Sequence, residues 1–174
     1  MKHNIFVQDN FFEDNFLKKL QAEVMSMEFK SRYNDFSKEL KKDNSMNNIY
    51  QRNFHHVVLS SNTPVVKEVV NNIRKYFHHN PKKIVSWYLL SFPNTPAVPH
   101  KDVSVFNCLI YLIGDKLVNN GTGFYEKEND DYELHTHIGF KENRAIFFDS
   151  TKWHSPLQFA GNSTPRYVMA NFMD

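Results

Sequence analysis

Two histidines and one aspartate in this chain have the types and the order needed to hold a metal ion. His100 and Asp102 are separated by one residue, and His154 lies far downstream. Alternate residues of a β-strand point to the same side, so His100 and Asp102 can reach one ion. Two imidazoles and one carboxylate are the ligand set of non-haem Fe(II), and they leave positions open for a chelating acid and for O₂. The spacing therefore predicts an iron site of this kind.

A single cation follows the distal histidine. Arg166 lies twelve residues after His154 and opens the apolar stretch 166–172. A guanidinium group binds a carboxylate through two parallel hydrogen bonds. We therefore expect the site to take a dicarboxylate cosubstrate.

Together these residues resemble the Fe(II)/2-oxoglutarate dioxygenases, and the prolyl-hydroxylase-like branch most closely. The likeness covers the stretch from about Lys83 to the C-terminus, with the segments 84–92, 106–112 and 121–125, the His-x-Asp loop, and the pair His154 and Arg166. It implies an α+β, mainly β fold, namely a double-stranded β-helix (jelly roll) with N-terminal helices packed on one side. It also implies Fe(II), 2-oxoglutarate and O₂ as cofactor and cosubstrates of a hydroxylase.

The resemblance assigns a role to each site residue by its position. His100, Asp102 and His154 match the iron ligands of the family. Arg166 matches the residue that binds the 5-carboxylate of 2-oxoglutarate, and Tyr111 matches a tyrosine that supports this carboxylate. The family's halogenases vacate the carboxylate position for chloride, so the presence of Asp102 argues against a halogenase.

The chain departs from the family pattern just before the His-x-Asp loop. Phe92 stands where many prolyl hydroxylases have a cosubstrate-binding tyrosine, and its ring cannot donate a hydrogen bond. Tyr88, four residues earlier, is the expected substitute. Asn107, four residues before Tyr111 on the same strand face, is a polar group that needs a partner when buried. We expect Asn107 to contact substrate or cosubstrate.

Other interpretations of the chain stay open. His135 and His137 place two imidazoles on one strand face, and Glu142 follows at a spacing that resembles the first motif of the cupins. The glycine and the second motif of that family are missing. A jelly-roll module that binds metal or protein without turnover is a further alternative. For a dioxygenase, the first expected substrate is a prolyl residue of a peptide or protein, and a free amino acid or other small metabolite is the alternative.

Length and composition are typical of one compact enzyme domain. The chain has 174 residues, of which 41% are hydrophobic and 15% aromatic, enough for a single well-buried core. We expect 1–82 to form a helical support region and 83–174 the jelly-roll catalytic core. The 21 basic and 19 acidic residues nearly balance at +2, so neither nucleic acid nor a membrane surface is an expected partner. One cysteine, Cys108, and the lack of a signal peptide or an apolar run of membrane-spanning length favour a cytoplasmic protein.

The apolar pattern predicts helices first and strands afterwards. Helices are expected at 14–27 and from Pro64 to Phe77, the second with Thr63 as N-cap. A short strand is expected at 5–7 and a loop at 31–48. The expected strands of the core are 84–92, 103–113, 123–127, 132–140, 144–148 and 166–173. Gly121 and Gly123 are expected to serve turn geometry.

Overall fold

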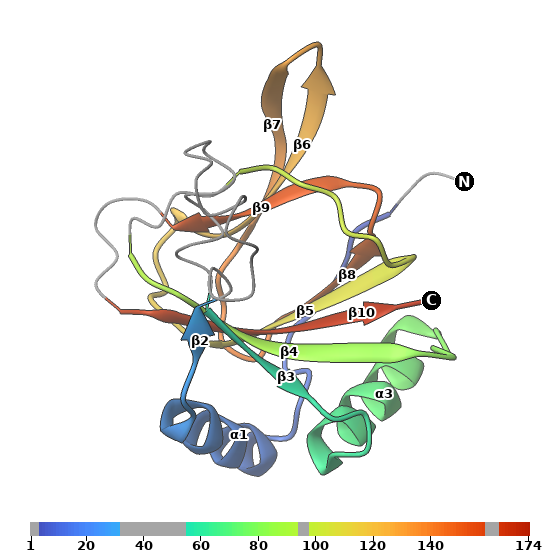
Figure 1. Ribbon diagram of the computed structural model, residues 1–174, viewed down its shortest axis with the longest axis vertical. Coiled ribbons are helices and arrows are strands. Elements are labelled where there is room, and N and C mark those ends of the chain that lie inside the picture. Colours follow the sequence, from blue (N-terminus) through green and yellow to red (C-terminus); the bar gives the residue numbers. More distant parts are fainter. Residues whose placement is uncertain (1–3, 32–54, 94–97, 159–163) are drawn as a thin grey trace, which may run out of the picture.

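A computed structural model describes residues 4–31, 55–93, 98–158 and 164–174. Within these residues, two helices lie beside two antiparallel sheets that face each other (Figure 1). In the described chain the larger sheet has seven strands in the order β1-β8-β5-β10-β4-β3-β2, and the smaller has three in the order β7-β6-β9. This is a double-stranded β-helix, so the predicted α+β, mainly β fold is confirmed.

Most strands of the core were predictable in place, although their ends differ. The larger sheet consists of β1 (Phe6–Gln8), β8 (Ala145–Asp149), β5 (Phe106–Ile113), β10 (Arg166–Met173), β4 (Ile84–Ser91), β3 (His55–Leu59) and β2 (Lys30–Ser31). The smaller sheet consists of β7 (Asp131–Gly139), β6 (Asn120–Glu128) and β9 (Trp153–Gln158). The sequence does not predict β2, β3 or β9. The prediction that β5 begins at Val103 is wrong, because residues 103–105 belong to a loop. The predicted loop 31–48 lies outside the described residues, except for Ser31 at the end of β2.

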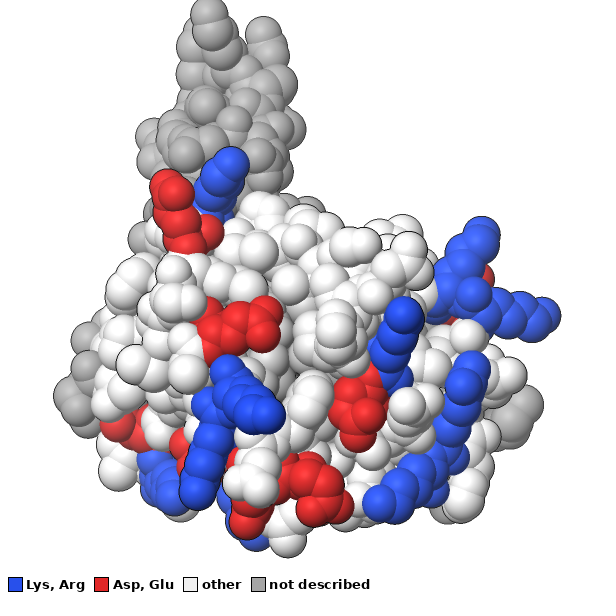
Figure 2. Space-filling model, turned by 90° about the horizontal axis from the view of Figure 1, so that it is seen from below, with Lys and Arg blue, Asp and Glu red and all other residues white. Residues whose placement is uncertain are grey.

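The two helices cover the outer face of the larger sheet (Figure 1). They are α1 (Asp14–Ser26) and α3 (Pro64–Phe77), as predicted. The Thr63 side chain caps α3 by accepting a hydrogen bond from the Val66 amide at 3.4 Å. Figure 2 shows basic and acidic side chains interspersed over this helical side. In the described part of the chain, neither helix is long and apolar enough to span a membrane.

Alternation along the central strands separates two apolar layers. On β5, Cys108 and Ile110 face the helices and pack in one core with residues such as Ile73 of α3. Tyr111 faces the other way and packs with Phe124 of β6, between the two sheets. The central strands are therefore buried on both faces, and the inner layer is the one that positions the site.

Candidate metal centre

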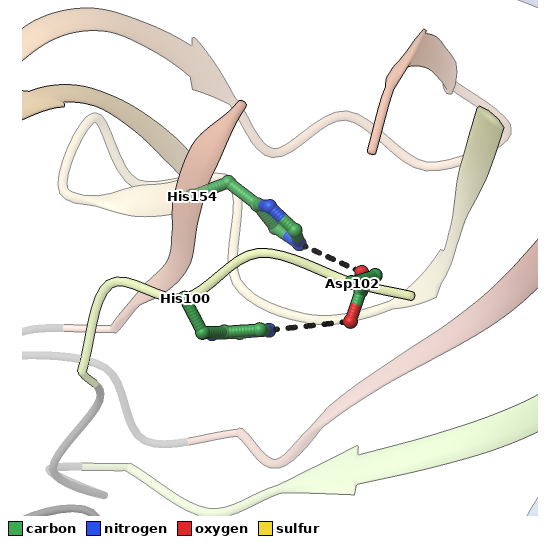
Figure 3. A group of neighbouring side chains, drawn as sticks. All are labelled: His100, Asp102 and His154. Carbon is green, nitrogen blue, oxygen red and sulfur yellow. Dashed lines mark ion pairs between the residues drawn. The ribbon is translucent and has the colours of Figure 1, made fainter. Parts of the chain in front are cut away.

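Three side chains converge between the two sheets, as Figure 3 shows. His100 and Asp102 lie in the loop between β4 and β5, and His154 lies in β9. The Nε2 atom of His100 is 3.9 Å from Asp102 Oδ1, and the Nε2 atom of His154 is 3.2 Å from Asp102 Oδ2. One donor atom from each residue lies within 4.8 Å of the other two. The predicted ligands are thus brought together, at a separation that one ion can bridge.

Main-chain hydrogen bonds join the two segments that carry these ligands. His100 and His154 form an isolated antiparallel bridge, with N–O distances of 3.0 and 2.9 Å. The Asp102 amide donates to the Ser150 carbonyl at 3.2 Å. The shared direction of His100 and Asp102 is therefore produced by a loop anchored on β9 and the turn before it. The expectation that a regular strand presents them is wrong.

A carbonyl oxygen sets the ring orientation of each histidine. The Nδ1 atom of His100 lies 3.0 Å from the Val98 carbonyl, and that of His154 lies 3.0 Å from the Lys152 carbonyl. A carbonyl can only accept, so each Nδ1 donates to it, and Nε2 is the ring nitrogen left to face Asp102 and a metal. Metal-binding histidines are commonly fixed in this tautomer by such a second hydrogen bond.

A buried amide orients the carboxylate. The Asn107 side-chain nitrogen donates to Asp102 Oδ2 at 2.5 Å, and its oxygen accepts from the hydroxyls of Ser104 at 2.7 Å and Ser150 at 3.0 Å. Asn107 and Ser150 are fully buried. Asn107 was expected to contact substrate or cosubstrate, but these contacts occupy both ends of its amide. We infer that it positions the carboxylate.

The electrostatic surroundings keep Asp102 ionised. Burial alone would raise the pKa of its carboxyl group, but the hydrogen bond and charge of His154 oppose this effect. The charge of His100 and the hydrogen bond from Asn107 act in the same direction, and the pKa is held below its ordinary value. A carboxylate in this state can bind a cation at neutral pH.

Arg166 is buried at the start of β10, with 3% of its surface exposed. Its Nη1 atom donates to Asn120 Oδ1 at 3.1 Å, to the Gly121 carbonyl at 2.5 Å and to the Leu157 carbonyl at 3.2 Å. Gly121 has φ of 149°, and a Cβ atom there would lie 2.2 Å from the Ile138 carbonyl oxygen. Gly121 lies inside β6 and not in a turn, so close approach of the backbone is the reason for glycine.

The triad and Arg166 line one cavity of about 100 Å³. Such a volume holds several water molecules, and hence a small acid. Ser91, which pairs with Arg166 across β4 and β10, and Thr122 add hydroxyl groups to its wall. The other wall residues are apolar or aromatic: Trp87, Leu89, Leu109, Pro156, Val168, Ala170 and Phe172. Sequence reasoning missed Ser91 and Thr122; the alternation of β4 would have indicated Ser91 once the inner face was known.

Neither of the two tyrosines predicted to support the cosubstrate lines this cavity, but Tyr111 contacts Thr122 of its wall. Its hydroxyl donates to Thr122 Oγ1 at 2.7 Å and lies 3.2 Å from the Ile138 carbonyl. Burial raises the pKa of Tyr111 to about 12, so the phenol stays protonated. Tyr88 is fully buried in the core beneath the helices, on the opposite face of β4. It does not replace the tyrosine missing at Phe92, and we withdraw it from the site.

The cupin-like alternative does not form a site. His135 is exposed on β7 and lies 3.8 Å from Glu126. Glu142 lines a separate hollow beside Arg144. Among the described residues, the group that lies close enough to hold an ion is the triad of His100, Asp102 and His154, and it does not include His137.

No protein-family model matches the sequence, and no curated protein is significantly similar to it. Solved structures, however, are similar in fold. A prolyl-4-hydroxylase from Pseudomonas putida superposes with a TM-score of 0.64 at 11% identity, over 99% of this chain and 92% of that one. HygX from Streptomyces hygroscopicus, solved with nickel, 2-oxoglutarate and hygromycin B, superposes with a TM-score of 0.66 at 8% identity, over 98% of this chain and 83% of that one. The non-haem α-ketoglutarate-dependent epimerase SnoN from nogalamycin biosynthesis superposes with a TM-score of 0.65 at 11% identity, over 99% of this chain and 78% of that one.

At these identities the likeness shows the fold. The chain has the fold of the non-haem, 2-oxoglutarate-dependent oxygenases, and its His-x-Asp and distal His residues meet at one point within that fold. The predicted resemblance is therefore confirmed for the architecture.

Proposed function

We propose that this chain is an Fe(II)- and 2-oxoglutarate-dependent oxygenase that acts as a single domain. The observation that carries the proposal is the triad, in which both Nε2 atoms and the carboxylate of Asp102 turn toward one point. Two imidazoles and a carboxylate fit Fe(II) and leave positions open on its other side. Each of the three ligands also has a second hydrogen bond that fixes its orientation.

The residues of the cavity would hold the metal and the cosubstrate. His100, Asp102 and His154 would bind Fe(II), which would supply the coupling of O₂ reduction to oxidative decarboxylation of 2-oxoglutarate. Arg166 would bind the distal carboxylate, because this residue lines the cavity and three acceptors on Nη1 fix the plane of its guanidinium group. Thr122 would assist, since its oxygen accepts the Tyr111 proton and its own proton is available to a second acceptor.

Hydroxylation of an unactivated C–H bond is the reaction we propose, with a prolyl residue of a peptide or protein as the first substrate class. The likeness to a prolyl-4-hydroxylase over 92% of that chain supports it. A free amino acid or other small metabolite is the second candidate, because HygX was solved with hygromycin B bound. The epimerase SnoN illustrates that one fold hosts several outcomes.

Anaerobic titration with Fe(II) and 2-oxoglutarate tests the cofactor assignment. A keto acid chelated to ferrous iron gives a weak visible charge-transfer band, and we expect this band in the wild type. His154→Ala should lose the band while His135→Ala, altered at an exposed histidine of β7, should keep it. A folded wild type without the band would contradict the proposal. Consumption of 2-oxoglutarate in air would then separate an enzyme from a binding module, which consumes none.

A further inference from the structure

The cavity beside the triad has a polar end and an aromatic end. Alternate residues of β10 face it in the order Arg166, Val168, Ala170 and Phe172. Arg166 is paired with Ser91 on β4 at one end, and Ala170 is paired with Trp87 nearer the other. Steps of two residues are about 6.6 Å along a strand. Polar and apolar contacts are thus separated along one strand.

The triad lies toward the aromatic end of this strand. Asp102 is held by Asn107, and Asn107 is paired with Phe172 across β5 and β10. A dicarboxylate that joins Arg166 to the triad would run along β10. The region that remains extends across the sheet, from β5 over Ala170 to Trp87 on β4.

This remaining region is a hollow with a small residue at its floor. Leu109, Ala170 and Trp87 are neighbours in one row across three strands, so a methyl group lies between two large side chains. The Trp87 and Phe172 rings meet edge to face, with centroids 5.2 Å apart. Beyond them the same face continues to Val58, paired with Trp87 and 57% exposed. The hollow is therefore bordered by an apolar residue that reaches solvent, and the His56 ring packs against Trp87 on the same face, with centroids 5.2 Å apart.

The charged residues that line the cavity already have a role in binding the metal and 2-oxoglutarate. Among the described residues that line it, those that ionise are the three ligands and Arg166, and the proposed function uses all four for metal and 2-oxoglutarate. An ionised group placed over Ala170 would lose hydration beside Leu109, Trp87 and Phe172, none of which offers a charge. An apolar group there would gain about 25 cal/mol for each Å² that it buries.

We propose that the primary substrate places an uncharged, ring-sized apolar group over Ala170, against Trp87 and Phe172 and next to the triad. This inference rests on the proposed function and narrows its substrate class. The occupant is a ring or branched side chain flanked by neutral groups, as in the interior of a peptide. A free amino acid carries an ammonium and a carboxylate group on the same small skeleton, and would bring both into the hollow.

Matched probes that share one side chain but differ in the charge of its flanking groups test this choice. The protein is loaded with Zn(II), which is inert to O₂, and with 2-oxoglutarate, and binding is followed by saturation-transfer NMR. The pairs are N-acetyl-L-prolinamide with L-proline and N-acetyl-L-leucinamide with L-leucine. We expect at least one neutral member to bind at least tenfold more tightly than its free amino acid.

Two variants and one control locate the binding. Ala170→Leu should fill the hollow and abolish the signal of the neutral probe, and Trp87→Ala, which removes one wall, should weaken it at least tenfold if Ala170→Leu does not fold. Met169→Leu, on the opposite face of β10 within the core beneath the helices, should bind as the wild type does. Each variant is first checked for the charge-transfer band with Fe(II) and 2-oxoglutarate.

The outcomes separate this inference from the function on which it rests. Absence of the charge-transfer band in the folded wild type contradicts the oxygenase assignment itself. If the band forms, the inference is overturned by equal or tighter binding of the free amino acids, by the absence of binding of either neutral probe, or by unchanged binding in the folded variants.

Discussion

Replacement of Asn107 by alanine should weaken metal binding without touching a ligand. The Asn107 amide, which is itself fully buried, donates to Asp102 Oδ2 at 2.5 Å. A hydrogen bond to a charged group contributes about 1.5–3 kcal/mol, which corresponds to a change of about 10- to 150-fold in affinity. Loss of a group that orients a metal ligand typically costs 10- to 100-fold. We therefore expect Asn107→Ala to raise the dissociation constant for Fe(II) by about 10- to 100-fold.

Asn171 supplies a matched control on the neighbouring strand. Asn171 is also fully buried, accepts from the Ser86 hydroxyl at 2.7 Å and donates to the Cys108 carbonyl at 2.9 Å. Asn171 is paired with Cys108 across β10 and β5, and Cys108 packs in the core beneath the helices. Asn171 therefore faces the helices, away from the cavity. Asn171→Ala should lower the free energy of unfolding by about 1–3 kcal/mol and leave metal affinity unchanged.

Anaerobic competition with a chelator of known affinity measures the dissociation constant of each variant. Chemical denaturation measures stability in parallel, so that a loss of metal binding through unfolding is recognised. The reasoning is refuted if Asn107→Ala binds Fe(II) as tightly as the wild type, or if Asn171→Ala loses as much affinity. The first result would mean that Asp102 is oriented without Asn107, and the second that the loss of affinity is not specific to the contact between Asn107 and Asp102.

Three further predictions concern the cosubstrate, the backbone and pH. Arg166→Ala should raise the 2-oxoglutarate concentration that half-saturates the charge-transfer band by about 10- to 150-fold through loss of a charge-assisted pair, whereas Arg144→Ala should leave it normal. Gly121→Ala should lower stability by about 1–3 kcal/mol, whereas Gly139→Ala, where a Cβ atom meets nothing within 4 Å, should melt like the wild type. The hydrogen bond from Arg144 is the largest influence on Asp9, and it outweighs the effect of burial and lowers the pKa from 3.8 to about 2. This pair therefore contributes its full stability above about pH 4 and loses it as pH falls toward 2. Because Asp9 is 34% exposed, we expect the contribution to be only about 1 kcal/mol. The loss of stability between about pH 4 and pH 2 that this pair causes should be absent when Asp9→Asn is denatured at the same pH values.

Local pattern predicted those elements whose own residues determine them. The start of α3 follows from Thr63 and Pro64, and β10 follows from an apolar run from Tyr167 to Met173 in which Asn171 is the one strongly polar residue. Two of the three missed strands, β3 and β9, were missed for a common reason. β3 begins with His55 and His56, and β9 holds His154, Ser155 and Pro156, so neither has the alternation of a strand. Their strand geometry comes from pairing with β4 and β6, which no local window contains.

The site was predictable in its ligand types and their order, but not in the face of each strand. Alternation indicates which residues share a face, and it identifies the inner face only when the other face is polar. β4 is largely covered on both faces, so Tyr88 and Trp87 are equally plausible as inward residues from sequence. The structure turns Trp87 inward and Tyr88 toward the helices, which reverses the prediction.

Hydrogen bonds to both sheets keep in place a site that is partly built on a loop. The loop with His100 and Asp102 has no regular structure of its own, yet it is bridged to His154 and held through Asn107 of β5. Arg166 is fixed in turn by carbonyl groups of β6 and β9. Groups that would bind the metal and the cosubstrate are thus tied to both sheets. The hollow over Ala170 is shaped by side chains alone, and it is therefore the part of the cavity in which substrate choice can change without disturbing the metal centre.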